Sequence, residues 1–262
     1  MCNKKILQTF LAILYKDIEI YNKRWLYRSI DAVVWIGSVL LVAHHIMPLF
    51  GIENRQYGTF TLIGHLAVWG LLEMLTSIAM FLSDLQGDRT ISYYLSLPIP
   101  AWLLFVEQAC ASAYKSMASS ILILPLGKLI LGSDLQLHMI HWPSFIFAYF
   151  LINMFFGFFT IFVASYVQDL PALTMVRSRV MFPLWFLVGC QFSWKMLYQV
   201  CPMAAFINLC NPIVYIMDGI RSTALPADQY LPFWLCMVMV MLFSMIFGYL
   251  GIRKLKLRLD CI

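Results

Sequence analysis

The stretch that decides the fold is Pro143–Tyr166, PSFIFAYFLINMFFGFFTIFVASY, which contains no Asp, Glu, Lys or Arg. An α-helix rises about 1.5 Å per residue, so roughly 20 residues cross a bilayer core of about 30 Å. An uncharged apolar run of this length predicts a transmembrane helix. Blocks of similar length and composition recur on both sides of it.

The chain contains six such blocks in total. They are Ser29–Phe50, Gly58–Ser83, Leu103–Leu126, Pro143–Tyr166, Val180–Tyr198 and Leu231–Ile252. Of the 262 residues, 62% are hydrophobic and 12% are charged, whereas soluble domains carry about 25% charged residues. We therefore predict an all-α polytopic membrane protein with a six-span domain over residues 29–252.

Residues 1–28 precede the first block and differ from it in pattern. Charged side chains interrupt any continuous apolar run, while apolar residues recur at helical spacing. These apolar residues are Ile6, Phe10, Ile13, Leu14 and Ile18. The pattern predicts an amphipathic helix that lies on the inner membrane surface. The segment lacks a small-residue cleavage site, so we expect no removable signal peptide.

The basic residues predict the orientation, because positive flanks are retained on the cytoplasmic side. With the N-terminus inside, the basic residues on the outside are Arg55, Lys128, Lys195 and Arg221. Lys115 lies within a span, and the other Lys and Arg residues fall inside, including those of a basic tail over residues 253–262. We therefore predict that both termini are cytoplasmic. The net charge of +5 then indicates contact with a membrane surface and not with nucleic acid.

Two connections between the blocks are too long to be simple turns. On the cytoplasmic side, residues 84–102 include a short helix-like segment that ends at Pro98 and Pro100, because proline stops a helix. On the outside, residues 199–230 contain apolar pieces that are too short to cross and that are broken at Asn211-Pro212. This pattern predicts a re-entrant hairpin in the outer leaflet before the last span.

Two segments resemble the ABC-2 type permease family. Asn211-Pro212-Ile213-Val214-Tyr215, followed by Arg221, is similar to the family's NPxxY…R stretch before the last span. The run RTISYYLSLPIP, from Arg89 to Pro100, is similar to the segment that leads into the family's third span. The acidic residue usual near the start of that segment has only Asp84 and Asp88 as counterparts.

The resemblance implies a permease subunit of an ATP-driven exporter in the bacterial inner membrane. Two copies, or two close relatives, would form the pathway, and a separate ATPase would bind ATP and Mg²⁺. The chain contains no G-x-x-x-x-G-K-[S/T] loop, so we expect no ATPase site, catalytic residue, cofactor or metal site in it. The expected cargo is a drug, a lipid or a lipid-linked glycan. A membrane-embedded transferase or hydrolase, or a non-transporting assembly subunit, are the alternatives.

Glu73 and Lys115 are conspicuous charges within the predicted spans, where charges are costly and often functional. Counted from the cytoplasmic ends of their spans, they lie at depths of roughly 15 and 18 Å. We therefore predict an ion pair between neighbouring spans. Both a structural role and a role in a substrate path or gate are open for this pair.

The two motif segments also supply candidate residues. Asp84, Asp88 and Arg89 are predicted to contact the ATPase through a coupling helix, and the alternative is a solvated loop with an interfacial helix.

Asn211, Pro212, Tyr215 and Arg221 are predicted to form an outer gate. The alternative is a capped interfacial helix whose Arg221 reaches the lipid headgroups. Between these segments, Cys201 and Cys210 could share an outside loop, and a disulfide between them is open.

Overall fold

The computed structural model describes residues 2–50, 55–87, 93, 94, 96, 99–187 and 192–259, and these residues contain helices and turns but no strand. The helices are α1 (Cys2–Asn22), α2 (Trp25–Leu41), η1 (Val42–Ile46), η2 (Met47–Phe50), α3 (Arg55–Gln86), α5 (Ala101–Ser120), α6 (Ile123–Leu131), η3 (Leu137–Met139), α7 (Trp142–Tyr166), α8 (Leu170–Val176), η4 (Arg177–Met181), α9 (Phe182–Leu187), α10 (Trp194–Val200), α11 (Pro202–Asn208), α12 (Pro212–Arg221), η5 (Ala227–Gln229) and α13 (Phe233–Leu259).

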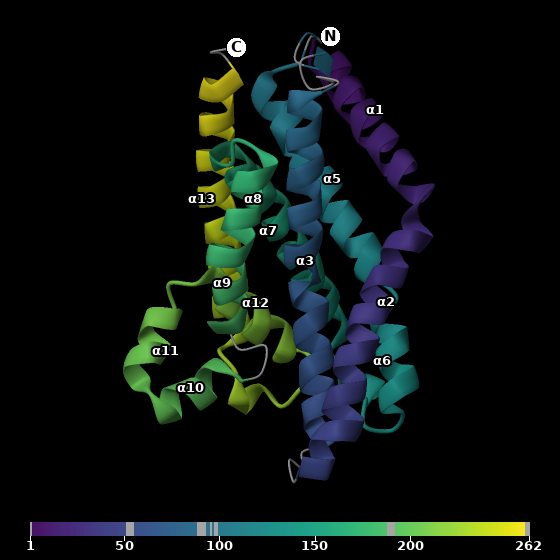
Figure 1. Ribbon diagram of the computed structural model, residues 1–262, viewed down its shortest axis with the longest axis vertical. Coiled ribbons are helices and arrows are strands. Elements are labelled where there is room, and N and C mark those ends of the chain that lie inside the picture. The colour runs from purple at the N-terminus through teal and green to yellow at the C-terminus, as the bar shows by residue number, and fades with distance from the viewer. Residues whose placement is uncertain are drawn as a thin grey trace.

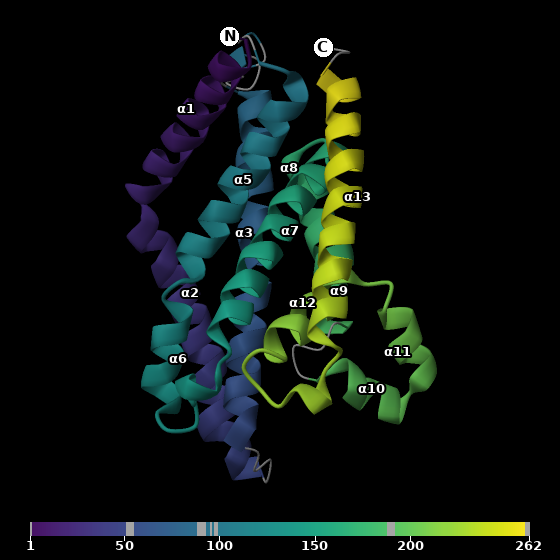
Figure 2. The same ribbon diagram turned by 180° about the vertical axis from the view of Figure 1, so that it is seen from behind.

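The long helices run along the longest axis of the molecule, and both termini lie near the same end of that axis (Figure 1). Seen from behind, α5, α7 and α13 follow one another across the bundle (Figure 2). The short helices α10, α11 and α12 lie toward the opposite end, where α10 and α11 project to one side. The two ends of the molecule therefore differ in construction.

Within the described residues, five helical stretches are long and apolar enough to cross a membrane. They are Trp25–Phe50, Tyr57–Leu85, Ala101–Leu131, Trp142–Tyr166 and Phe233–Arg258. A bent pair, Pro202–Asn208 with Pro212–Arg221, also passes the test when its two helices are taken together. The chain is an α-helical, multi-pass membrane protein, as the composition predicted.

The range predicted for the fifth span, Val180–Tyr198, is wrong in its bounds. Described residues of this range belong to η4, α9 and α10, and the helical run that contains η4 and α9 already begins at Leu170. It begins there because the side chain of Asp169 accepts a hydrogen bond from the backbone N–H of Ala172. α10 is a separate helix, since Ser193 caps its start by accepting from the N–H of Met196 at 3.3 Å.

Helix α1 confirms the predicted N-terminal helix, and its apolar stripe packs against protein. Ile13 is buried with Tyr94 and Leu104, and the other four residues of the stripe are half-buried. α1 is inclined alongside α5 (Figure 1), against which it packs. The opposite face leaves Leu7 and Leu11 exposed.

A short elbow at residues 23–24 joins α1 to α2, and two hydrogen bonds hold this elbow against α5. The hydroxyl of Tyr21 donates to the backbone carbonyl of Lys115 at 3.1 Å. The indole N–H of Trp25 donates to the carbonyl of Ala118 at 2.7 Å. Both acceptors lie on α5, so the elbow is fixed to that helix from either side.

Helix α7 is the centre of the bundle, because it packs against α3, α5 and α13. Two glycines bring backbones together at these crossings. A Cβ atom at Gly157 would collide with the backbone carbonyl of Ala109 on α5, and one at Gly251 on α13 would lie 2.8 Å from the backbone of Phe162 on α7. Small residues allow such close approach of helices in a membrane.

The α5–α7 crossing gives a first test. We expect Gly157→Ala to destabilise the protein by about 1–2 kcal/mol, since overpacking against a backbone outweighs the gain in helix propensity. The matched control is Gly37→Ala on α2, where the nearest atom to the new methyl group, Cδ2 of Leu126, lies 3.8 Å away. Thermal unfolding in detergent should show a lower midpoint for the first variant only. Equal midpoints would contradict the close crossing.

Candidate functional site

A partly open cavity of about 550 Å³ lies between the α1–α2 elbow and helices α3, α5 and α7. Its charged lining consists of Lys16, Lys23, Arg24, Arg28, Lys115, Asp17, Glu73 and Asp84. Cavities of a few hundred Å³ with a small number of converging polar groups are the usual form of ligand sites. This cavity is the candidate functional site.

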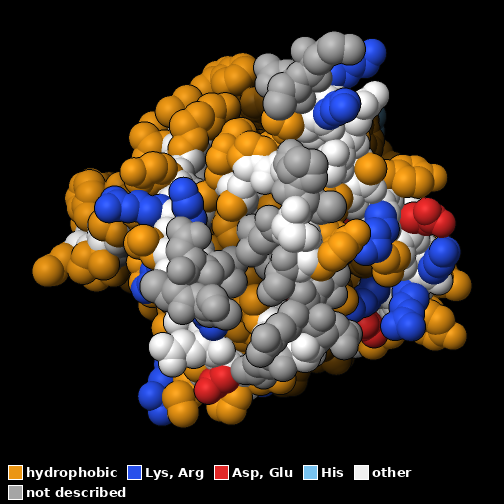
Figure 3. All heavy atoms as spheres, turned by 90° about the horizontal axis from the view of Figure 1, so that it is seen from above, with side chains coloured by type: hydrophobic (Ala, Val, Ile, Leu, Met, Phe, Trp, Pro, Cys, Tyr) orange, Lys and Arg blue, Asp and Glu red, His pale blue; other side chains and the backbone are white. Residues whose placement is uncertain are grey.

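The α1–α2 elbow supplies the exposed rim of the cavity. Lys16, Lys23 and Arg24 line the cavity and are exposed. Seen from the end that carries the termini, Lys and Arg side chains gather on the side of the molecule where α1 lies (Figure 3). The ammonium of Lys16 donates a hydrogen bond to the hydroxyl of Tyr94, and this bond raises the pKa of Lys16. The rim is therefore cationic at neutral pH.

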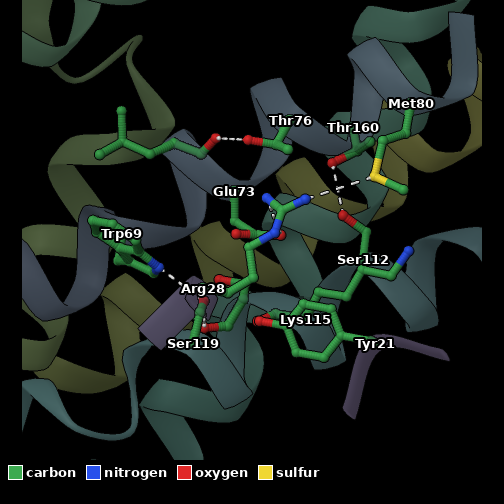
Figure 4. Close-up of polar contacts among 12 residues, drawn as sticks. Tyr21, Arg28, Trp69, Glu73, Thr76, Met80, Ser112, Lys115, Ser119 and Thr160 are labelled. Carbon is green, nitrogen blue, oxygen red and sulfur yellow. Dashed lines mark hydrogen bonds and ion pairs between the residues drawn. The ribbon is translucent and has the colours of Figure 1, made fainter. Parts of the chain in front are cut away.

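An ion pair lies deeper in the cavity. Nη1 of Arg28 is 3.9 Å from Oε1 of Glu73, and the side chain of Glu73 is only 6% exposed. In Figure 4 the guanidinium of Arg28 faces this carboxylate, while its Nη2 approaches the sulfur of Met80. Arg28 comes from the first turns of α2 and Glu73 from α3, so the pair connects two helices.

The predicted ion pair between Glu73 and Lys115 is not formed as a direct contact. In the part of the chain that the structure describes, the cation within 4.0 Å of the Glu73 carboxylate is Arg28. Lys115 is half-buried and lines the same cavity from α5, but its side chain extends away from Glu73 (Figure 4). The two charges line one cavity, but the carboxylate of Glu73 lies next to Arg28 and not next to Lys115.

Of the three predicted ATPase-coupling residues, the structure describes only Asp84. Asp84 lies near the end of α3 and lines the cavity. Asp88 and Arg89 lie outside the described residues, as does most of the segment over residues 90–98. The structure therefore does not test the coupling helix.

The Asn211–Arg221 motif forms α12, a short helix whose residues 213–221 are all buried. Asn211 caps it, since its Oδ1 accepts a hydrogen bond from the N–H of Ile213 at 3.1 Å, and Pro212 occupies the first turn. The hydroxyl of Tyr215 donates to the carbonyl of Leu209 at 2.9 Å. α12 is bent by 99° relative to α11.

Arg221 is 0% exposed, so the alternative in which it reaches the lipid headgroups is wrong for this chain. Its Nε donates to the carbonyl of Phe60 at 3.3 Å, and its Nη1 donates to the carbonyl of Phe192 at 3.4 Å. The guanidinium also lies 3.5 Å from the centre of the Phe60 ring. Arg221 thus fastens α12 to the first turns of α3.

Several partners in these sites were not found from the sequence. Arg28 was counted only among the cytoplasmic cations, although it is the partner of Glu73. Gly64 makes room for Arg221, because a Cβ atom there would collide with the guanidinium. Asp218, also buried, accepts from the N–H of Leu231 at 3.3 Å and connects α12 to the start of the last span. The three-residue spacing of Asp218 and Arg221 was the feature of the sequence that could have pointed to these contacts.

Cys201 and Cys210 are free and exposed, so they form no disulfide in this structure.

Comparisons of the chain with protein-family models, with curated proteins and with solved structures found no match.

The pairing of Glu73 can be tested by double-mutant cycles. We expect Arg28→Gln to destabilise the protein by about 1–3 kcal/mol, because it leaves a buried carboxylate without its cation. Adding Glu73→Gln should restore part of that loss, giving a coupling energy above about 0.5 kcal/mol. Thermal unfolding in detergent measures each corner of the cycle.

The matched cycle combines Lys115→Gln with Glu73→Gln. We expect these two changes to add within about 0.5 kcal/mol. Stronger coupling of Glu73 to Lys115 than to Arg28 would show that the pair predicted from the sequence is the energetically important one.

Proposed function

We propose that this chain is the permease subunit of an ATP-driven exporter of the ABC-2 type, with six spans and both termini in the cytoplasm. It forms half of a transmembrane pathway together with a second copy or a close relative. A separate ATPase supplies the energy, and the cargo is a drug, a lipid or a lipid-linked glycan.

The observation that carries this proposal is the buried half-length helix α12. It has 10 residues, which at about 1.5 Å per residue is about half of a bilayer core. It packs against α3, α7 and α13, and helix ends at membrane depth are tolerated where protein surrounds them. Broken helices of this kind are typical of transporters. The same residues carry the resemblance to the ABC-2 permeases.

The proposal of six crossings, with α11 and α12 as a re-entrant pair, is supported by the position of the termini and by the length of one further helical run. Both termini lie at the same end of the molecule (Figure 1), and such an arrangement requires an even number of crossings. Five long spans are present in the described residues. The run from Leu170 to Leu187 through α8, η4 and α9 is about 27 Å long at 1.5 Å per residue, enough for a sixth crossing.

The orientation can be tested by cysteine labelling. Lys5 on α1 and Gln229 in η5 are both exposed. α1 begins at the end of the molecule that carries the termini, whereas η5 precedes α13, which runs to that end from the other side of the bundle (Figure 1). In a background free of other cysteines, we expect Gln229→Cys to react with a membrane-impermeant maleimide in intact cells. Lys5→Cys should react only after the membrane is permeabilised. The reverse pattern, or reaction of both in intact cells, would contradict the proposed orientation.

The partner can be tested by crosslinking in membranes that hold the native complex. We expect Arg89→Cys, carrying a photoactivatable crosslinker, to capture an ATPase that has no spans of its own. Lys195→Cys is the matched control, since Lys195 lies on α10 near the opposite end of the molecule. Addition of ATP and Mg²⁺ should change the crosslinking yield at Arg89→Cys, because nucleotide-driven closure moves the coupling segment.

Two results would count against export. One is capture of lipid alone at Arg89→Cys, and the other is equal capture of the ATPase at both positions. Vesicles with the purified complex then provide the direct measurement, which is ATP-dependent movement of cargo.

A further inference from the structure

We propose that the cavity between the α1–α2 elbow and helices α3, α5 and α7 binds a phosphate group, carried by the headgroup of an anionic lipid. The inference concerns binding within a single protomer. It does not depend on the proposed function, because the cavity is built by this chain alone.

Cations outnumber carboxylates in the cavity. Five Lys and Arg side chains line it beside three carboxylates, and Glu19, outside the lining, pairs with Lys23 at 3.4 Å, which leaves an excess of one positive charge. Arg28 is compensated by Glu73 at 3.9 Å. Lys115 is half-buried within a span, and no carboxylate of the described residues lies within 4.0 Å of its ammonium. A cation at this depth is costly without a counter-ion.

Hydrogen-bond donors in the cavity also lack an acceptor. Oγ of Ser77 is buried and makes no hydrogen bond to any described residue. Ser77 follows Glu73 by one helical turn on α3, and both line the cavity. Together with Lys115, it presents donors that a ligand rich in acceptor oxygens would satisfy. Phosphate combines negative charge with several acceptor oxygens, whereas a neutral ligand would leave Lys115 without an anion in direct contact.

The cavity has an exposed rim and a more buried wall, which suits a headgroup that enters from the membrane surface. Lys16, Lys23 and Arg24 are exposed and form the rim, whereas Lys115 is half-buried on α5 beside the elbow. A volume of about 550 Å³ accommodates a phosphate with part of its glycerol backbone. The rim attracts the anion, and the deeper donors fix it.

A lipid is the source that the surroundings favour. The outer face of α1 exposes Leu7, Leu11, Tyr15 and Ile20, which are between 52% and 68% exposed. A helix with exposed apolar residues beside a basic rim is typical of a segment at the lipid headgroup level. Basic pockets between transmembrane helices bind phosphorylated headgroups by the same combination of charge and depth.

The test measures lipid binding to the full-length protein in detergent, with no ATPase present. Short-chain phosphatidic acid is titrated against diacylglycerol, which has the same acyl chains but no phosphate, and the thermal unfolding midpoint is followed. We expect phosphatidic acid to raise the midpoint and diacylglycerol to leave it unchanged. Lys115→Gln should weaken phosphatidic acid binding about tenfold or more, because a charge-assisted hydrogen bond is lost.

Two control variants separate the cavity from general attraction to charge. Lys115→Arg keeps the cation and should keep most of the affinity. Lys256→Gln removes an exposed cation of α13 outside the cavity and should bind as the unchanged protein does. Should Lys115→Gln fail to fold, Arg24→Gln at the exposed rim takes its place, with the same direction of change expected.

A separate titration with inorganic phosphate distinguishes the two sources. Stabilisation by phosphatidic acid but not by inorganic phosphate supports a lipid headgroup. Equal stabilisation by both would overturn the lipid assignment and support a soluble phosphate compound as the ligand. Equal effects of phosphatidic acid and diacylglycerol, or full binding by Lys115→Gln with normal folding, would overturn the phosphate site. None of these outcomes depends on transport.

Discussion

The contacts of the buried guanidinium of Arg221 are those on which the arrangement of the helices at the end opposite the termini depends. A charge enclosed in an apolar bundle must be met by acceptors, because its desolvation costs several kcal/mol. The carbonyls of Phe60 and Phe192 and the Phe60 ring meet it, and the absent side chain of Gly64 leaves the space. α12 cannot leave α3 without exposing this charge to lipid. The half-length helix is thereby held in the bundle, and Asp218 continues the connection to the last span.

The class of fold follows from the sequence, but one span does not. Long uncharged runs such as Pro143–Tyr166 predict a crossing helix by length and composition alone, and the structure has a helix long and apolar enough to cross over Trp142–Tyr166. The fifth predicted span was placed by hydropathy, which is weak where Arg177 and Arg179 interrupt the apolar run. The signal for the start of the helix in this region was local. Asp169 and the following Leu-Pro form a helix cap and first turn, and such capping pairs mark a start independently of hydropathy.

The candidate site shows what the depth of a residue along its helix can predict and what it cannot. Counting residues along straight helices predicts similar depths for Glu73 and Lys115, and both residues line one cavity. Depth does not say in which direction a side chain points, nor which neighbouring helix is tilted toward it. The elbow before α2 brings Arg28 within reach of Glu73, and the side chain of Lys115 extends elsewhere. The burial of α12 could not be predicted from the sequence either, because burial depends on which helices surround it. The motif residues themselves were identifiable.

The elbow between α1 and α2 has a mechanical consequence. Tyr21 and Trp25 fix it to the carbonyls of α5. Glycines let the backbones touch where α5 crosses α7 and where α7 crosses α13. These three helices can be expected to shift as a rigid unit. α1 is attached to that unit both at the elbow and along its apolar stripe, so a force on α1 is passed to the whole block without melting any helix. The cavity lies between the elbow and the block, and the same contacts therefore set its width.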